Sequence, residues 1–184
     1  MMWNLPTTVN IDGKDYEIRN NCDYRVVLDV IRVIAAEDLT DNEKLQLSLF
    51  IFYKKPQRIE NISAAASEMM KIINLGEIEQ EKETSQPPIM DWEHDFPQLA
   101  PPVSRVLGYS VRDEHRYTHW YDFIGAYMEI GECTFATVIS IRSKMRKGKK
   151  LDETEKEFYR SNKKIVDLPR KLTSGERDWL ESDW

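Results

Sequence analysis

Two histidines are spaced as a pair of metal ligands would be on a helix. His115 and His119 are four residues apart, and this spacing places two imidazoles on one helix face, as in zinc proteases. Those enzymes need a glutamate directly after the first histidine as general base, whereas Arg116 follows here. A third ligand would have to come from farther along the chain, from Glu129 or Cys133. A metal-dependent enzyme is therefore disfavoured, and we expect a helix start with one exposed and one packed histidine.

The cysteines offer no better chemistry. Cys22 and Cys133 are too few for a disulfide framework or a four-thiolate zinc site. A nucleophilic pair of Cys133 with His119 lacks any surrounding protease signature. Acidic residues are so frequent that the spacing of two carboxylates carries no information about acid–base catalysis. The sequence therefore predicts a protein that is not an enzyme, without catalytic residue, metal or cofactor.

One basic cluster is a candidate for binding another molecule. It occupies residues 142–150. Its candidate protein-binding residues are Arg142, Lys144, Arg146 and Lys147. Such a cluster can meet phosphates or an acidic protein surface, and the acidic segment 77–95 is a surface of that kind in the same chain. The alternative is an ordinary solvated helix end.

Charge and hydropathy exclude two further classes of protein. The 184 residues carry a net charge of −6, whereas a non-specific nucleic-acid binder is more often basic, so nucleic acid is an unlikely partner. The longest apolar-rich stretch, Leu45–Tyr53, is far shorter than the roughly 20 residues that span a bilayer. We expect a soluble protein in a reducing compartment, with no membrane partner.

The elements that must position these residues are mostly helices. Val9 and Ile11 alternate with polar residues before the turn signal Asp12-Gly13, which predicts one β-hairpin. Helix starts are indicated by Asp23 and by the capping boxes at 40–43 and 152–155. Leu45–Tyr53 is apolar on most sides, so we expect that helix to be central. The aromatic stripe of Trp120, Phe123 and Tyr127 is typical of a core rather than a ligand site, and Pro101-Pro102 predicts that the helix there is split or starts late.

The predicted fold class is mainly α: an N-terminal β-hairpin followed by about six or seven helices in a compact, bundle-like arrangement. We expect a single domain over residues 1–168, with an acidic linker near 77–95, and a polar C-terminal tail over 169–184. The end of the tail supplies three further candidate protein-binding residues, Trp179, Leu180 and Trp184. Burial of these apolar residues, with pairing of the acidic and basic segments, predicts a homo-oligomer.

The order of the motifs resembles the bacteriophage gene-product-fifteen family. The resemblance covers roughly residues 5–168. It rests on Leu5-Pro6, the hairpin from Val9 to Ile18, the run Ile89-Met90-Asp91-Trp92-Glu93-His94-Asp95, Gly108, His119-Trp120-Tyr121 with Phe123, Phe135 through Arg142, and Glu157-Phe158-Tyr159-Arg160. Two features depart from the family pattern: the proline pair at 101–102 and the tail after Pro169.

The resemblance implies a phage or prophage tail morphogenesis protein. Its expected role is that of a tail assembly chaperone, with the tape measure protein and the tail tube protein as partners. It implies a location in the bacterial host cytoplasm during assembly, and absence from the mature virion. It carries no catalytic residues over to this chain. The alternative function is a nucleic-acid-associated phage regulator that uses residues 142–150.

Overall fold

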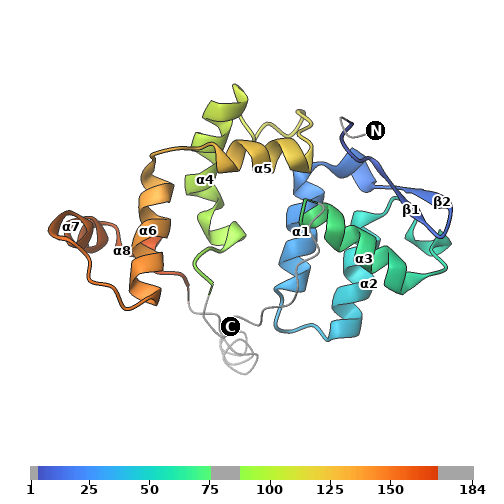
Figure 1. The fold of residues 1–184 in the computed structure, drawn as a ribbon, viewed down its shortest axis with the longest axis horizontal. Helices are drawn as coiled ribbons and strands as arrows, with labels where there is room; N and C mark the ends of the chain where they lie inside the picture. Colours follow the sequence, from blue (N-terminus) through green and yellow to red (C-terminus); the bar gives the residue numbers. More distant parts are fainter. Residues whose placement is uncertain (1–3, 76–87, 170–184) are drawn as a thin grey trace, which may run out of the picture. The chain divides into compact units, whose positions relative to one another are not determined.

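The protein is mainly helical, with one two-stranded antiparallel hairpin near its N-terminus (Figure 1). A computed structural model describes residues 4–75 and 88–169. The elements in these ranges are β1 (Thr8–Ile11), β2 (Lys14–Glu17), the 3₁₀ turn η1 (Arg19–Cys22), α1 (Tyr24–Ile34), α2 (Asp41–Phe52), the 3₁₀ turn η2 (Pro56–Arg58), α3 (Ile62–Ile73), α4 (Trp92–Leu107), α5 (Trp120–Met128), α6 (Thr134–Arg146), α7 (Glu153–Ser161) and α8 (Lys163–Val166). The predicted fold class, a hairpin followed by helices, is confirmed.

The chain forms two compact units. Among the described residues, unit 1 comprises 4–75 and 98–131, and unit 2 comprises 88–97 and 132–169. Helix α4 therefore contributes its first turns to unit 2 and the rest to unit 1. This grouping does not test the single domain expected over 1–168, because compact units can be parts of one domain.

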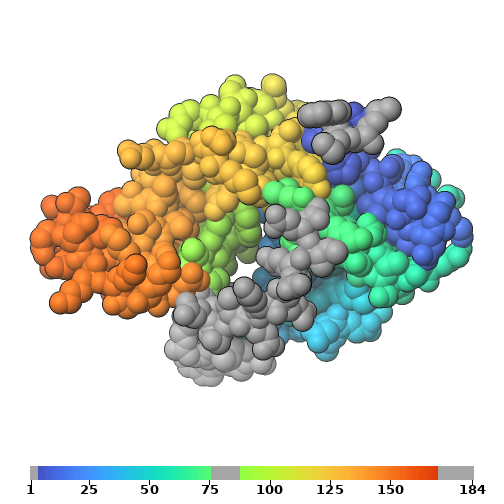
Figure 2. All heavy atoms as spheres, viewed as in Figure 1, coloured from blue at the N-terminus to red at the C-terminus, as the bar shows by residue number. Residues whose placement is uncertain are grey.

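The hairpin has the predicted turn. Asp12 and Gly13 both have positive φ, 50° and 81°, as a type I′ turn requires, and Asn–Gly or Asp–Gly pairs accept this at low cost. The register pairs Val9 with Tyr16 and Ile11 with Lys14. Val9 and Ile11 are buried against α3, and Figure 2 shows the blue hairpin beside the green atoms of that helix. The packing supplies the stability that an isolated hairpin lacks.

The predicted helix starts are confirmed by capping contacts. The Asp23 carboxylate accepts a hydrogen bond from the Arg25 amide at 3.0 Å, at the start of α1. The boxes of Thr40 with Glu43 and of Asp152 with Glu155 have both reciprocal bonds in place at α2 and α7. Such caps satisfy amides that the first helical turn leaves without intrahelical partners.

Aromatic side chains form the core of unit 1. The rings of Tyr24 and Phe123 stack with centroids 4.3 Å apart, and Trp120 donates its indole N–H to the Ile73 carbonyl at 3.0 Å. The Tyr53 hydroxyl donates to the Ala65 carbonyl at 2.8 Å. The core interpretation of the aromatic stripe is confirmed for Trp120 and Phe123, which are buried, while Tyr127 is half-buried.

Helix α4 corrects two predictions made for this part of the chain. It runs unbroken from Trp92 to Leu107, so the helix is neither split nor delayed by Pro101-Pro102. The residues 92–95 of the predicted acidic linker are helical, while residues 76–87 lie outside the described ranges. Leu99 and Val103 are fully buried, and packing of that stripe outweighs the two amide hydrogen bonds that the prolines remove.

Helix α2 is not central, contrary to the expectation. Its inner side buries Leu49 and Phe52, but Leu47 and Phe50 on the other side are 40% and 61% exposed. A short apolar run cannot reveal from sequence which of its sides the other helices cover.

The core of unit 2 is smaller than that of unit 1. It is built on Val138, Ile141 and Val166, with half-buried residues of α7 packed against them. None of the helices in the described ranges combines the length and the apolar character that crossing a bilayer requires.

Candidate functional site

The two histidines have different surroundings and do not share a helix face. His119 is buried and caps α5, because its Nδ1 accepts the Tyr121 amide at 3.0 Å. The ring proton therefore lies on Nε2, which donates to the Pro6 carbonyl at 3.0 Å. His115 lies in the preceding loop with its side chain 89% exposed. The paired-ligand geometry is wrong, and the expectation of one exposed and one packed histidine is confirmed.

The cysteines lie in different units. Cys22 is fully buried in unit 1, and burial raises the pKa of its thiol to about 12. Cys133 is half-buried in unit 2, where its Sγ accepts the Ala136 amide at 3.4 Å as the cap of α6. Across residues 4–75 and 88–169, no three His, Cys, Asp or Glu side chains are grouped closely enough to hold a metal ion.

Cys22 is expected to resist thiol reagents at pH 8 until the protein unfolds. Its thiol stays neutral far above that pH and has no access to solvent, and the thiolate is the reactive form. Mass spectrometry after brief alkylation of a Cys133→Ser variant measures this directly, since serine preserves the cap. Full labelling of Cys22 without denaturant would contradict the buried placement.

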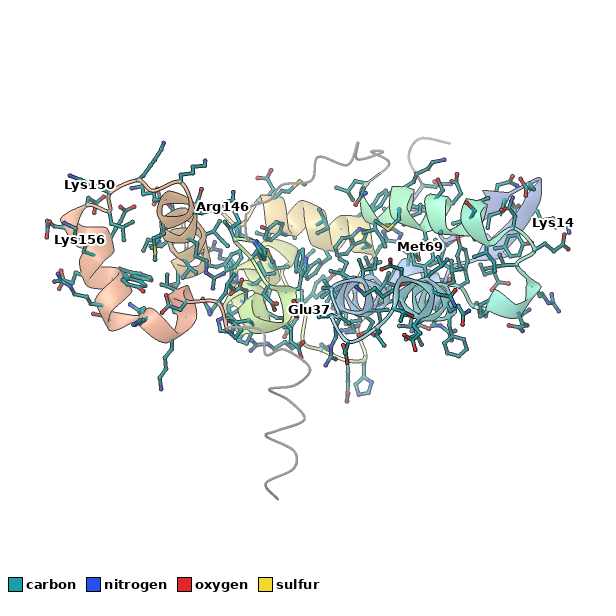
Figure 3. The ribbon with its side chains drawn as sticks, turned by 90° about the horizontal axis from the view of Figure 1, so that it is seen from below. Lys14, Glu37, Met69, Arg146, Lys150 and Lys156 are labelled. Atoms are coloured by element: carbon teal, nitrogen blue, oxygen red, sulfur yellow. The ribbon has the colours of Figure 1, made fainter. Side chains whose placement is uncertain are left out.

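The structure divides the predicted basic cluster into buried and exposed members. Arg142 is 7% exposed and lies inside unit 2. Lys144 forms an ion pair with Glu155 at 2.5 Å. Arg146 is half-buried, and Lys147 is exposed just after α6. Figure 3 shows Arg146 on α6 and Lys150 in the connection between α6 and α7.

Arg142 is the centre of a buried polar cluster. Its guanidinium donates to both carboxylate oxygens of Asp95, at 2.7 and 2.8 Å, and Asp95 is fully buried. It also donates to the carbonyls of Ile89, Ile165 and Val166. The two-pronged ion pair with Asp95 and the bonds to these carbonyls link α6 to the start of α4 and to α8. This cluster was not predicted, because Asp95 lies in the segment expected to be a linker, although the aspartates at 91 and 95 resemble a helix start.

The exposed remainder of the cluster is a positive surface, which we call the basic end. It consists of Lys147, Lys149 and Lys150, whose side chains are exposed. Within the described residues, no carboxylate lies within ion-pair distance of these three ammonium groups. The basic end can attract an acidic partner, whereas Arg142 and Lys144 are held by their own chain. The other candidates, Trp179, Leu180 and Trp184, lie outside the described residues.

A surface hollow beside the hairpin was not predicted. Its volume is about 550 Å³, and it lies between β2 and the segment Tyr53–Glu60. The Tyr16 hydroxyl donates to the Arg58 carbonyl at 3.2 Å, and Lys14 pairs with Glu60 at 2.7 Å at its edge. Charges of both signs line the hollow, so it has no preference for a ligand of one charge.

The family model described as Bacteriophage Gp15 protein matches residues 1–118, more than half of the 184 residues. The chain belongs to this family. The predicted resemblance is thereby confirmed, and this Gp15-family protein is phage-related. No curated protein and no solved structure matches it.

The family match and the structure have different boundaries. The matched residues of this Gp15-family protein include the hairpin and α1–α4, and they end just before α5. The motifs quoted after residue 118, and with them the basic end, lie beyond the match. Family membership therefore supports a role in phage biology without assigning it to any residue of α5–α8.

Proposed function

We propose that this Gp15-family protein is a phage tail assembly chaperone that binds the tape measure protein and the tail tube protein, and that it catalyses no reaction. The observation that carries the proposal is the family match over residues 1–118. A long tape measure helix exposes apolar surface before the tube encloses it, and a helical partner can cover that surface. The proposed location is the host cytoplasm during assembly, with release before the virion is mature.

The basic end supports a binding role on a defined surface. Its three exposed lysines can orient an acidic client and speed its encounter, while apolar contacts supply most of the affinity. The alternative function, a nucleic-acid-associated phage regulator, is less favoured. Arg142 and Lys144, which would have to meet phosphates, already form ion pairs with Asp95 and Glu155.

Co-purification of the tape measure and tail tube proteins from phage-producing cells tests the proposal. The full chain is expected to recover both, and the variant Lys147→Glu/Lys149→Glu/Lys150→Glu should recover roughly tenfold less. The matched control is Arg160→Glu/Lys163→Glu/Lys164→Glu, which reverses three exposed charges elsewhere in unit 2. Recovery of neither client, or a salt-sensitive complex with duplex DNA that the first variant abolishes, would favour the regulator instead.

A further inference from the structure

The loop that carries the basic end is fixed by its own backbone. Lys147, Gly148 and Lys149 follow α6 directly, and their amides donate to carbonyls in the last turn of that helix at 3.1, 3.0 and 2.9 Å. Gly148 has a φ of 62°, as the residue that reverses the chain after a helix requires. At the other end of the loop, Leu151 packs against the apolar core of unit 2. The lysine side chains of the basic end therefore extend from a backbone that is anchored on both sides.

Three amides of this loop are already bonded and cannot cradle a phosphate. Phosphate sites in loops and at helix ends are usually built from free N–H groups, whereas these amides donate to α6. The loop also follows the C-terminal end of α6, which carries partial negative charge. The basic end offers ammonium groups on a chain whose net charge is −6. These properties fit the carboxylates of a partner protein better than a polymer of closely spaced phosphates.

The carboxylates at the start of α7 are occupied by other lysines. The Lys144 ammonium group pairs with Glu155 at 2.5 Å and lies 4.0 Å from Asp152. The Glu155 side chain is only 15% exposed, so solvent and salt screen this pair less than a pair on the open surface. Glu153 pairs with Lys156 at 2.6 Å. Three carboxylates that directly follow the basic end in the chain are therefore held by lysines outside it.

We propose that the basic end binds a cluster of carboxylates on a partner protein, and that Lys144 keeps this surface open by holding Glu155 and Asp152. An internal ion pair competes with binding, because an ammonium group must leave its internal carboxylate before it contacts another one. Lys144 removes this competition without contacting the partner. The inference rests on the proposed function for the identity of the partner as a client. The binding of carboxylates and the role of Lys144 are testable without any client.

Fluorescence anisotropy of a labelled hexaglutamate peptide, titrated with the full chain at low ionic strength, tests both statements. The unmodified protein is expected to bind the peptide, and Lys144→Met should weaken binding about fivefold, the most that one exposed ion pair is worth. The double variant Lys144→Met/Glu155→Gln should bind about as tightly as the unmodified protein. Glutamine accepts the capping bond from the Asp152 amide but presents no charge to the basic end.

Lys71→Met is the matched control. It also breaks a half-exposed pair of a lysine with a glutamate, that of Lys71 with Glu68, but on α3 of unit 1. Binding of the peptide should therefore be unchanged in this variant. An equal loss in Lys71→Met and Lys144→Met would show that the total charge of the protein matters rather than the carboxylates beside the basic end, and would overturn the proposal.

Three further results with the peptide would also overturn the proposal. They are no binding by the unmodified protein, no recovery in Lys144→Met/Glu155→Gln, and displacement of the peptide by a short DNA duplex at a lower concentration than by unlabelled hexaglutamate. The last result would assign the surface to phosphates. If the peptide results are as expected but neither client is recovered from phage-producing cells, this inference is supported and the proposed function alone is contradicted.

Discussion

Arg142→Met is expected to lower the free energy of unfolding by about 3–5 kcal/mol, the usual cost of removing one partner of a buried ion pair. The substitution keeps most of the apolar volume but leaves the Asp95 carboxylate, which is fully buried, without its two charged hydrogen bonds. It also leaves the carbonyls of Ile165 and Val166 without their donor. Because the apolar core of unit 2 is small, this buried ion pair should contribute a large share of the unit's stability.

Urea unfolding followed by circular dichroism measures the effect of Arg142→Met. Lys156→Met is the matched control, because Lys156 forms an exposed pair with Glu153 and such pairs contribute little. The double variant Asp95→Leu/Arg142→Met should recover part of the loss, since no charge is then left buried. If Arg142→Met is as stable as the control, the buried pair does not hold unit 2 together.

A fragment of residues 1–118 is expected to lack a cooperative unfolding transition, although it contains the whole family match. It lacks α5, whose Trp120, Phe123 and Ile124 are 3%, 0% and 7% exposed. Burial of three such side chains stabilises by roughly 5–9 kcal/mol in total. That is comparable to the whole stability of a typical domain, about 5–15 kcal/mol.

Specific contacts make α5 hard to replace. The fragment loses the ring stacked on Tyr24 and the indole that donates to the Ile73 carbonyl. Tyr24 of α1, which is 2% exposed in the whole chain, would then face water. Solvent exposure of this surface favours an expanded or aggregated state over a packed one.

Thermal melting of two fragments distinguishes the loss of α5 from the general effect of shortening the chain. The fragment of residues 1–131 is the control, because it includes α5 and ends where unit 1 ends. Asp95 loses Arg142 in both fragments, so the two fragments differ only in residues 119–131, which hold α5. We expect a sharp transition for 1–131 and a gradual one for 1–118. Equal midpoints and equal sharpness would show that α5 is dispensable.

Local signals in the sequence predicted the elements well. Asp12-Gly13 predicted the hairpin because only a few residue types accept two successive positive φ angles. Asp23 and the boxes at 40–43 and 152–155 predicted helix starts because a cap needs only residues close in sequence. The order of motifs along the chain also indicated the phage family, and the family match confirmed it.

The candidate sites were predicted less well, because each depends on which side of a helix is covered. The basic cluster reads as one positive surface in the sequence, but the structure buries Arg142 against Asp95 and leaves Lys147 exposed. The spacing of His115 and His119 suits a helix face, but α5 begins only after His119. These outcomes depend on contacts between residues that are far apart in the sequence. Arg142 contacts Asp95 across a separation of 47 positions, and Tyr117 contacts Asn21 across 96 positions.

The sequence by itself therefore determined the hairpin, the helix starts, the mainly helical class and the family, all of which follow from local backbone chemistry and motif order. Only the tertiary structure decided that α4 continues through its prolines, that α2 exposes Leu47 and Phe50, and that Arg142 is internal. The physical reason is that burial is a property of contacts between distant segments. Packing of a buried stripe can outweigh a weak local preference, and a charge can be buried where a partner of opposite charge meets it.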